Sequence, residues 1–485
     1  MQAKKALLVF IVFTIILSIM QFTVPNIIGF DGYLHIKAAD IIKNEGFIKE
    51  FPWAKYTILP DNYADIQLLF RLLLIPFTFF GLNLGAKIAS TLFAAIAFTV
   101  FYWFLAQNKI KYPFFWTILY MFTSEFLMYR FMLPRQMPLV ITLIILTIHF
   151  LQKKRYLLLG LAAFAFVLLH SSFVFQILVI ILYLILEKIF VKKFDYKLIL
   201  YPFVGLVAAL VINPYFPNNI SFIYTQLFKV NLIANLFNVE WKPWAFFEFI
   251  QNNILVLVYI SASSFIIFKN KKITKIESLF VLSTLFFFIY TLLSRRMQEF
   301  LVPFSILALA FLFNDYYDKI NKISKNKFFK IVKFSAAVIF IIAATFNFIL
   351  FRQDIKNNDF LFNFNGCAEW MKTNIPKNSL IFTNAYAFPY LFFKNSDLIY
   401  THGIDLTYSY LHDENKFERY MAILQGKAKD KQDFIISDYN PDYVFSGKIK
   451  QDVQLFNYIV SHRENYKAAY EDEWCAVLEV KKAAV

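Results

Sequence analysis

An aspartate and a histidine stand four positions apart in the polar segment that follows the first long apolar run. They are Asp31 and His35, within residues 29–40. On a helix, residues four apart share one face, so the two side chains would lie together near the start of that helix. Such a pair suits a proton acceptor or a ligand for a cation. Asp31 is equally suited to capping the helix, because Asp is favoured at N-caps and Gly29 permits the turn before it.

Two short loops that the hydropathy pattern places on the outer side offer a second kind of chemistry. They carry Arg130, Arg135 and Gln136 in residues 129–138, and Arg295, Arg296 and Glu299 in residues 294–300. Arginine on this side runs against the usual excess of positive charge inside. A guanidinium has a planar fork of donors that matches phosphate oxygens, so the clusters favour a site for a lipid-linked phosphate or diphosphate. The alternative is that these side chains reach out to lipid headgroups.

Three further residues are candidates for the same site. His170 ends an apolar run on the predicted outer side, where a single histidine is either structural or a substrate contact. Asp61 and Asp65 lie in the polar stretch after the first apolar run. They would position an acceptor or share the role of base with Asp31.

The composition indicates which class of protein must hold these residues in place. Hydrophobic residues make up 59% of the 485 positions, charged residues only 17%, and there are 62 Phe. One soluble core of this length cannot bury so much apolar surface, so the sequence predicts a polytopic α-helical membrane protein. The formal net charge of +16 comes largely from Lys between apolar runs, where it sets orientation. We therefore expect no nucleic-acid partner.

Eleven apolar runs are read as helices that cross about 30 Å of hydrocarbon. They are residues 6–24, 86–106, 113–129, 138–151, 156–170, 173–186, 198–212, 254–268, 278–293, 300–313 and 331–350. Residues 66–80 are also apolar, but Arg71 and Pro76 interrupt them. We expect a helix there that lies on or dips into the bilayer surface. Because no small-residue cleavage site follows the first run, it is predicted to be an uncleaved span.

Positive charge predicts the orientation of these spans. Lys4 and Lys5 precede the first run and place the N-terminus in the cytoplasm. Later basic residues fall in loops that this assignment makes cytoplasmic: Lys109, Lys111, Lys153, Lys154, Arg155, Lys188, Lys192, Lys193, Lys269, Lys271, Lys272, Lys275 and those of residues 319–333. An odd number of spans then puts the C-terminus outside, with long external loops at residues 25–85 and 213–253.

The chain divides into a membrane domain, residues 1–351, and an extracytoplasmic α/β domain, residues 352–485. The second part alternates helices expected near 367–373, 416–424 and 453–462 with strands expected at 379–382, 443–446 and 476–480. Both cysteines of the chain, Cys367 and Cys475, lie in it, on the side where oxidation is permitted. A disulfide and two buried thiols both stay open, since sequence does not show that the two Cβ atoms are close.

The layout resembles the GT-C superfamily of membrane glycosyltransferases over nearly the whole chain. These enzymes take sugars from polyprenyl-phosphate or polyprenyl-diphosphate donors and share an acidic residue in the first external loop, where this chain has Asp31. The run from Asp31 to His35 is similar to the Asp-x-Tyr-x-His segment of oligosaccharyltransferase catalytic subunits; protein mannosyltransferases have a similar layout. The resemblance implies a lipid-linked sugar donor, membrane lipids as surroundings, and a glycan, lipid or protein as acceptor.

Two departures limit what the resemblance implies. The second loop of oligosaccharyltransferases carries acidic metal ligands, whereas here that loop has Arg130, Arg135 and Gln136, with Glu125 the nearest acid. The metal ligands are therefore unknown, and a divalent cation such as Mg or Mn stays an open cofactor. Their Trp-Trp-Asp-Tyr-Gly acceptor motif is replaced by residues 383–390, Thr-Asn-Ala-Tyr-Ala-Phe-Pro-Tyr. Transfer to an Asn sequon is not supported.

Three functions are weighed on these observations. In the first, a glycosyltransferase acts at the outer face of the membrane, with Asp31 as base, His35 beside it, and arginines on the leaving phosphate. In the second, the protein is a transporter or assembly protein for lipid-linked saccharides without catalysis, which would need polar or broken helices near the bilayer midplane. The third is a scaffold, in which Asp31 and the arginines would lie far apart.

Overall fold

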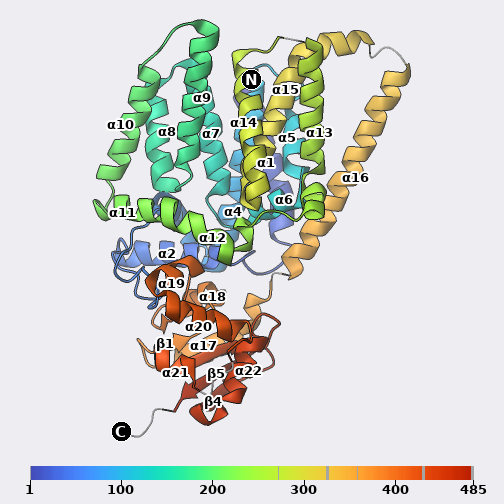
Figure 1. Cartoon of the computed structure of the whole chain (residues 1–485). Coiled ribbons are helices and arrows are strands. Elements are labelled where there is room, and N and C mark those ends of the chain that lie inside the picture. The colour runs from blue at the N-terminus through green and yellow to red at the C-terminus, as the bar shows by residue number, and fades with distance from the viewer. Residues whose placement is uncertain (1, 271, 324–326, 358, 429–431, 482–485) are drawn as a thin grey trace.

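The structure is a computed structural model that describes residues 2–270, 272–323, 327–357, 359–428 and 432–481, with side chains outside the description at 2–3, 270, 318–323 and 327–336. It consists of a bundle of long helices with a small α/β domain at one end, formed by the C-terminal part of the chain (Figure 1). We call this end of the bundle the lower end, as Figure 1 draws it.

The first two thirds of the chain are helical. The α-helices are α1 (Gln2–Gln21), α2 (Asp31–Glu45), α3 (Leu68–Thr78), α4 (Leu82–Gln107), α5 (Pro113–Phe122), α6 (Glu125–Met132), α7 (Met137–Lys153), α8 (Tyr156–Leu169), α9 (Phe173–Val191), α10 (Lys197–Val211), α11 (Asn218–Thr225), α12 (Asn231–Phe237), α13 (Phe246–Asn270), α14 (Lys275–Leu293), α15 (Gln298–Ile323) and α16 (Lys327–Asn357). Single turns of other helix types are η1 (Gln226–Val230), η2 (Val239–Trp241) and η3 (Arg295–Met297).

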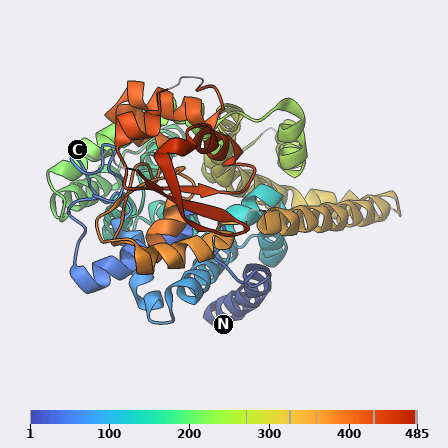
Figure 2. The ribbon, with the colours of Figure 1, turned by 90° about the horizontal axis from the view of Figure 1, so that it is seen from below.

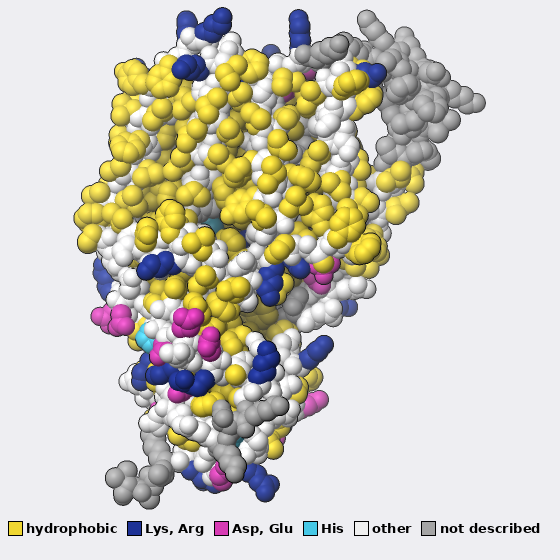
Figure 3. All heavy atoms as spheres, viewed as in Figure 1, with side chains coloured by type: hydrophobic (Ala, Val, Ile, Leu, Met, Phe, Trp, Pro, Cys, Tyr) yellow, Lys and Arg dark blue, Asp and Glu magenta, His cyan; other side chains and the backbone are white. Residues whose placement is uncertain are grey.

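The bundle is that of a polytopic membrane protein. Within the described residues, eight helices are long and apolar enough to cross a membrane, and up to nine if the bent pair α6 and α7 counts as one span. Hydrophobic side chains cover this part of the surface, whereas charged side chains gather at its upper edge and over the lower domain (Figure 3). The eleven predicted spans also include α5, α8 and α10, which have 10, 14 and 15 residues.

The predicted single span over residues 113–129 is wrong, because two helices occupy it. The α5 helix ends at Phe122, and Ser124 then caps α6 by accepting a hydrogen bond from the Leu127 N–H at 3.1 Å. A serine cap favours a new helix start, which the apolar pattern around it does not show. The axis turns by a further 103° between α6 and α7. Arg135 and Gln136 lie in this second turn.

The long external loop predicted at residues 213–253 is largely helical. Its α11, η1 and α12 run across the lower end of the bundle rather than through it (Figure 1). Large apolar side chains on this segment are exposed, among them Phe228, Leu232 and Leu236. In an apolar helix that lies along the membrane boundary, such side chains face the lipid.

The C-terminal domain is an α/β unit around one five-stranded sheet. Its elements are η4 (Leu361–Phe364), α17 (Asn365–Asn374), β1 (Leu380–Phe382), α18 (Phe388–Lys394), β2 (Ile399–Tyr400), α19 (Leu406–His412), α20 (Glu414–Leu424), α21 (Phe434–Tyr439), β3 (Tyr443–Gly447), α22 (Val453–Ser461), η5 (Arg463–Asn465), β4 (Tyr466–Glu471) and β5 (Cys475–Val480). The strand order is β2-β1-β3-β5-β4, parallel around β1 and antiparallel among β3, β5 and β4. Seen from below, it covers the middle of the bundle end (Figure 2).

Successive side chains of β3 point to opposite faces of the sheet, and one of these faces packs against the bundle. Phe445 on β3 belongs to the apolar cluster that continues into the bundle, whereas its neighbour Val444 packs in a second cluster with α20, α21 and α22. The loop before α3 also extends the sheet edge. The Tyr400 N–H donates to the Trp53 carbonyl at 3.0 Å, and the Lys55 N–H donates to the Tyr400 carbonyl at 2.9 Å.

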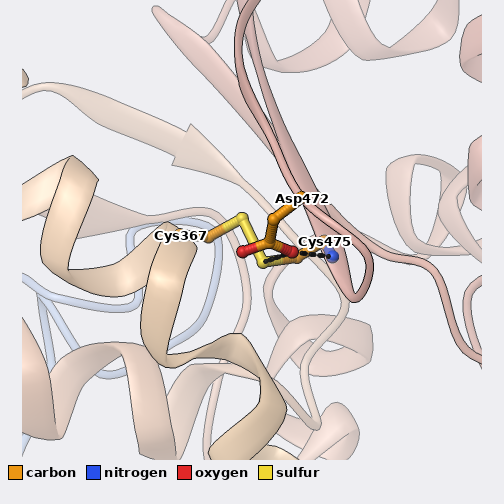
Figure 4. Close-up of side chains that lie close together, drawn as sticks. All are labelled: Cys367, Asp472 and Cys475. Atoms are coloured by element: carbon orange, nitrogen blue, oxygen red, sulfur yellow. Dashed lines mark hydrogen bonds between the residues drawn. A yellow bond between two sulfur atoms is a disulfide. The ribbon is translucent and has the colours of Figure 1, made fainter.

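Cys367 and Cys475 form a disulfide that joins α17 to β5 (Figure 4). Their Cα atoms are 6.3 Å apart, and the bond closes a sequence separation of 108 residues. Of the two alternatives left open by the sequence, the structure has the disulfide. Asp472 lies beside it and accepts a hydrogen bond from the Cys475 N–H at 2.9 Å.

The N-terminal helix begins at the upper end of the bundle and the C-terminal domain lies at the lower end (Figure 1). An odd number of membrane crossings requires the two termini to lie at opposite ends of the bundle. Which of these ends faces the cytoplasm stays a prediction. Lys271 and most of the basic stretch 319–333 lie outside the residues whose side chains are described.

The close contact of Gly160 on α8 with Gly205 on α10 allows a test of how these two helices pack. A Cβ added at Gly205 would lie 2.1 Å from the Gly160 carbonyl oxygen, so the helices approach more closely than any side chain allows. We expect Gly205→Leu to lower the free energy of unfolding by about 1–3 kcal/mol, measured as thermal unfolding in detergent. The matched control is Val207→Leu on the exposed side of the same helix. Equal loss in both variants would show that the contact is unimportant.

The disulfide yields a second test. Replacing Cys367 and Cys475 together by Ala should destabilise the C-terminal domain by about 2–5 kcal/mol, because the unfolded chain regains a long open loop. Limited proteolysis across a denaturant series would report the loss. In the wild type, a maleimide should label neither cysteine before reduction. Labelling of the unreduced, denatured protein would contradict the bond.

Candidate active site

A cavity of about 490 Å³ lies at the lower end of the bundle, between the helices and the C-terminal domain. Its walls come from α2, the loop before α3, the α6–α7 and α8–α9 turns, η1, α12, η2, η3 and the loop before α19. The predicted site residues that line it are Asp31, His35, Asp65, Arg135, Gln136, His170 and Arg296. Segments far apart in the sequence therefore meet in one polar space at the edge of the apolar bundle.

Asp31 is the first residue of α2 and does not cap it. Phe30 occupies the N-cap position, and no side chain caps this helix. Asp31 instead pairs with Arg135 through its Oδ2 atom, and its side chain is 37% exposed. A Cβ on Gly32 would lie 2.7 Å from the Pro134 ring, so the missing side chain lets α2 approach the turn that carries Arg135. The alternative that Asp31 is only a helix cap is thereby removed.

His35 lies one turn further along α2, on the same side, and is buried. Its ring meets the Phe70 ring edge-on at 5.3 Å, and its Nδ1 atom has no hydrogen-bond partner among the described residues. Burial, together with Arg71 and Arg135, lowers the pKa of His35 well below its ordinary value. His35 is therefore a neutral imidazole at the base of the cavity.

Arg135 also contacts Glu240, which the sequence did not single out as a site residue. One terminal nitrogen of Arg135 lies 3.2 Å from both carboxylate oxygens of Glu240. Arg130 donates to the same carboxylate at 2.6 Å and to Glu299, which is fully buried. Burial would raise the pKa of Glu240, but Arg130, Arg135 and Arg296 hold it well below its usual range. Arg130 and Glu299 lie behind the cavity wall and support it.

Asp65 belongs to a second buried pair. Its Oδ2 atom lies 3.0 Å from Arg71, and its Oδ1 atom accepts a hydrogen bond from the Gln67 N–H at 2.9 Å. Arg71 also donates to the Tyr63 hydroxyl at 2.6 Å. Burial raises the pKa of Asp65, although Arg71 opposes the shift. In the sequence, Arg71 stands out because it interrupts an apolar run. That interruption predicts a surface helix and does not indicate a site residue.

Arg296 and Arg295 point to different places although they are adjacent. Arg296 lines the cavity, with its Cζ atom 5.1 Å from the centre of the Trp241 ring. Arg295 pairs with Glu248 at 2.9 Å and lies over Trp244, away from the cavity. Arg295, Arg296 and Glu299 were all expected to share one cavity with Asp31, and of these three only Arg296 lines it.

His170 lies in the α8–α9 turn with a defined tautomer. Its Nδ1 atom accepts a hydrogen bond from the Ser172 N–H at 3.1 Å, so the neutral ring carries its proton on Nε2. Burial, Arg296, Arg130 and Arg135 lower the pKa of His170 to about 3. The ring therefore offers an N–H donor without a positive charge.

The C-terminal domain contributes residues that sequence reasoning missed. Asp405 and Tyr408 line the cavity, and the Tyr408 hydroxyl donates to Gln226 of η1 at 2.7 Å. Ile404, just before Asp405, has φ +66°, which a β-branched residue rarely adopts. Burial raises the pKa of Asp405, and the Thr407 N–H donates to its carboxylate at 2.9 Å. Strained backbone positions of this kind cluster at functional sites.

The chain is similar in structure to several solved membrane proteins. AglB, an archaeal oligosaccharyltransferase from Archaeoglobus fulgidus solved with an inhibitory peptide and a dolichol-phosphate, matches with a TM-score of 0.61 and 11% identity over 91% of this chain and 69% of that one. The same organism's oligosaccharyltransferase in complex with Zn and sulfate matches with a TM-score of 0.57 and 11% identity over 94% and 71%. ArnT from Cupriavidus metallidurans bound to undecaprenyl phosphate matches with a TM-score of 0.59 and 11% identity over 97% of both chains.

The chain has the GT-C fold. No protein-family model and no curated protein sequence matches it. The resemblance drawn from the residue run at Asp31 is thus confirmed as a GT-C fold that extends over nearly the whole chain.

Of two further predicted contacts, Asp61 lies outside the cavity, whereas Gln136 lines it. Asp61 is exposed on the surface and does not line the cavity. Gln136 lines the cavity and is buried, and its Oε1 atom has no hydrogen-bond partner among the described residues. An amide in that state is available to a bound ligand.

The donor set of this cavity does not fit a divalent cation. Three of its four carboxylates, Asp31, Asp65 and Glu240, already face arginines. Within the described ranges, three potential ligand atoms come within 4.8 Å of one another at Cys367, Asp472 and Cys475 alone. The two sulfurs there are joined in the disulfide, and a metal needs thiolates.

The neutral state of His170 predicts an acid-sensitive fold. The unfolded chain binds a proton at this residue near pH ~6.5, the ordinary pKa of His, whereas the folded protein does so only near pH 3. Stability should therefore fall as the pH falls through this window, by at most about 1.4 kcal/mol per pH unit from this residue. His170→Gln should flatten the pH dependence of thermal unfolding, and the exposed His412→Gln should not. Parallel curves for the wild type and His170→Gln would contradict the assignment.

Proposed function

We propose that this protein is a glycosyltransferase that moves a sugar from a polyprenyl-phosphate-linked or polyprenyl-diphosphate-linked donor to an acceptor at one face of the membrane. The observation that supports it most is that Asp31, a carboxylate, and Arg296, a guanidinium, line one cavity at the boundary of the apolar bundle. A base for the acceptor and a cation for the leaving phosphate are the two groups that such a transfer needs.

The reaction proposed is a direct displacement. An acceptor hydroxyl gives its proton to Asp31 while its oxygen forms a bond to the anomeric carbon of the sugar. The bond from that carbon to the phosphate oxygen breaks, and the phosphate leaves with the electron pair. Arg135 holds the Oδ2 atom of Asp31, and no described residue bonds the Oδ1 atom. The free oxygen is the one we assign to the acceptor proton.

The leaving phosphate is assigned to Arg296, with His170 as a neutral donor beside it. Both side chains line the same cavity, and the charge of Arg296 is one cause of the lowered pKa of His170. Fixed donors in a site with little water stabilise the charge that develops on the phosphate. His35 and Gln136 are buried residues of the cavity wall and are assigned to orienting the sugar.

Apolar side chains at the rim support a lipid-linked donor. Leu227, Phe228 and Leu232 of η1 and α12 line the cavity, and Phe228 and Leu232 are 57% and 74% exposed. A polyprenyl chain would leave the cavity over these side chains into the bilayer. Consistent with this route, the AglB and ArnT structures hold dolichol-phosphate and undecaprenyl phosphate.

We place the site on the extracytoplasmic face, with the N-terminus in the cytoplasm, because of the lysines before α1 and between later helices. The acceptor is a hydroxyl of a glycan, a lipid or a protein. The division of the chain near residue 351 into a membrane domain and an extracytoplasmic domain is part of this proposal.

The role of Asp31 is tested by Asp31→Asn. Purified protein is incubated with a panel of radiolabelled polyprenyl-linked sugars and acceptors, and turnover should fall about 100- to 10,000-fold because an amide cannot accept the proton. Donor binding should persist. The control is Asp40→Asn on the same helix, where Asp40 pairs with Lys43 and does not line the cavity. Unchanged turnover in Asp31→Asn would remove Asp31 from the mechanism.

The same assay separates catalysis from transport. A transporter of lipid-linked saccharides would move the labelled lipid between leaflets of a vesicle without forming a glycosylated product. Movement with no product, in protein that binds the donor, would replace the proposed transfer by the transport alternative.

A further inference from the structure

The three arginines of the cavity differ in whether a carboxylate already engages them. Arg71 pairs with Asp65, and Arg135 pairs with both Asp31 and Glu240. The Arg296 side chain has neither an ion pair nor a hydrogen bond among the residues that the structure describes. The described part of the cavity therefore has one cation ready for an anion.

Trp241 holds this cation in a useful orientation. The Arg296 Cζ atom lies over the indole ring at 5.1 Å from its centre. A guanidinium over a ring is attracted by the ring face, which leaves its N–H groups for hydrogen bonds to another partner. Two such N–H groups match two oxygens of one phosphate.

The other donors near Arg296 add no charge. His170 contributes a neutral Nε2–H, because its Nδ1 atom accepts the Ser172 N–H. Gln136 contributes an uncharged amide. Together with Arg296 they can hold several phosphate oxygens while supplying a single positive charge.

We propose that the donor carries one phosphate, as a polyprenyl monophosphate sugar rather than a diphosphate one; this inference rests on the proposed function. A sugar joined to a lipid through one phosphate has one negative charge, which Arg296 balances. A diphosphate link has two. The second charge would meet arginines that carboxylates already neutralise, close to Asp31 and Glu240 themselves.

Two other features agree with a single phosphate. A divalent cation could neutralise a diphosphate, but three of the four cavity carboxylates that would bind it face arginines. The cavity volume of about 490 Å³ lies in the lower half of the range of about 300–1,000 Å³ for small-molecule sites. It suits one sugar and one phosphate.

The test compares two probes that differ by one phosphate, undecaprenyl phosphoglucose and undecaprenyl diphosphoglucose. Their affinities for the full-length protein in lipid nanodiscs are measured once in EDTA and once in Mg²⁺. We expect the monophosphate probe to bind about tenfold more tightly or better, because the additional charge of the diphosphate has no unpaired cation to meet.

Two variants probe the charge balance. Arg296→Ala should weaken binding of the monophosphate probe about tenfold or more. Glu240→Gln removes one negative charge and releases Arg135, so it should tighten binding of the diphosphate probe about three- to tenfold. A structural defect would not improve binding. The control is Arg419→Ala, since Arg419 pairs with Asp438 outside the cavity, and thermal unfolding checks that each variant is folded.

Each other outcome has a definite meaning. Equal or tighter binding of the diphosphate probe by the wild type, in either buffer, overturns the inference and leaves the proposed glycosyl transfer standing. A monophosphate preference that survives Arg296→Ala overturns the assignment of the balancing charge to Arg296. Binding of neither probe overturns the proposed function and the inference together.

Discussion

One arginine connects the parts of the cavity. Arg135, in the turn between α6 and α7, contacts Asp31 on α2 with one terminal nitrogen and Glu240 on η2 with the other. Arg130 then joins Glu240 to Glu299 on α15. Charges alternate in sign along this chain of contacts. Segments from four distant parts of the sequence are thereby held at the lower end of the bundle, and the position of the catalytic candidate Asp31 depends on Arg135.

The alternation follows from where the charges lie. At the edge of an apolar bundle, an unpaired buried charge loses its hydration without compensation, so each member needs partners of opposite sign. Glu240 shows the result, since its neighbouring arginines depress its pKa although burial acts the other way. The same rule makes Arg296 informative. It carries a charge in the same cavity but stacks on Trp241 instead of pairing with a described carboxylate, so a negatively charged ligand is its natural partner.

The sequence predicted the membrane bundle and, in the C-terminal domain, α17, α20, α22, β1, β3 and β5, because apolar runs and alternating patterns are local signals. It also predicted a site that included Asp31 and Arg296, and the structure brings both to one cavity; their roles stay predictions. It missed β4, in which only Tyr466 is buried and the residues show no apolar alternation. It missed Asp405 because a single acid in a domain of mixed composition carries no signal until the domain is placed against the bundle. Arg295 could not be told from Arg296 without the directions of the two side chains.

The placement of Asp405 depends on backbone contacts rather than on side-chain pattern. The loop between α2 and α3 pairs with the edge of β2, where the Tyr56 N–H donates to the Thr401 carbonyl at 3.0 Å. Pairing covers a sheet edge that would otherwise be open. It also ties the loop that begins after α2 to the chain that leads into Asp405, only a few residues beyond Thr401. The C-terminal domain is thus held as a wall of the cavity, and Asp405 is part of that wall.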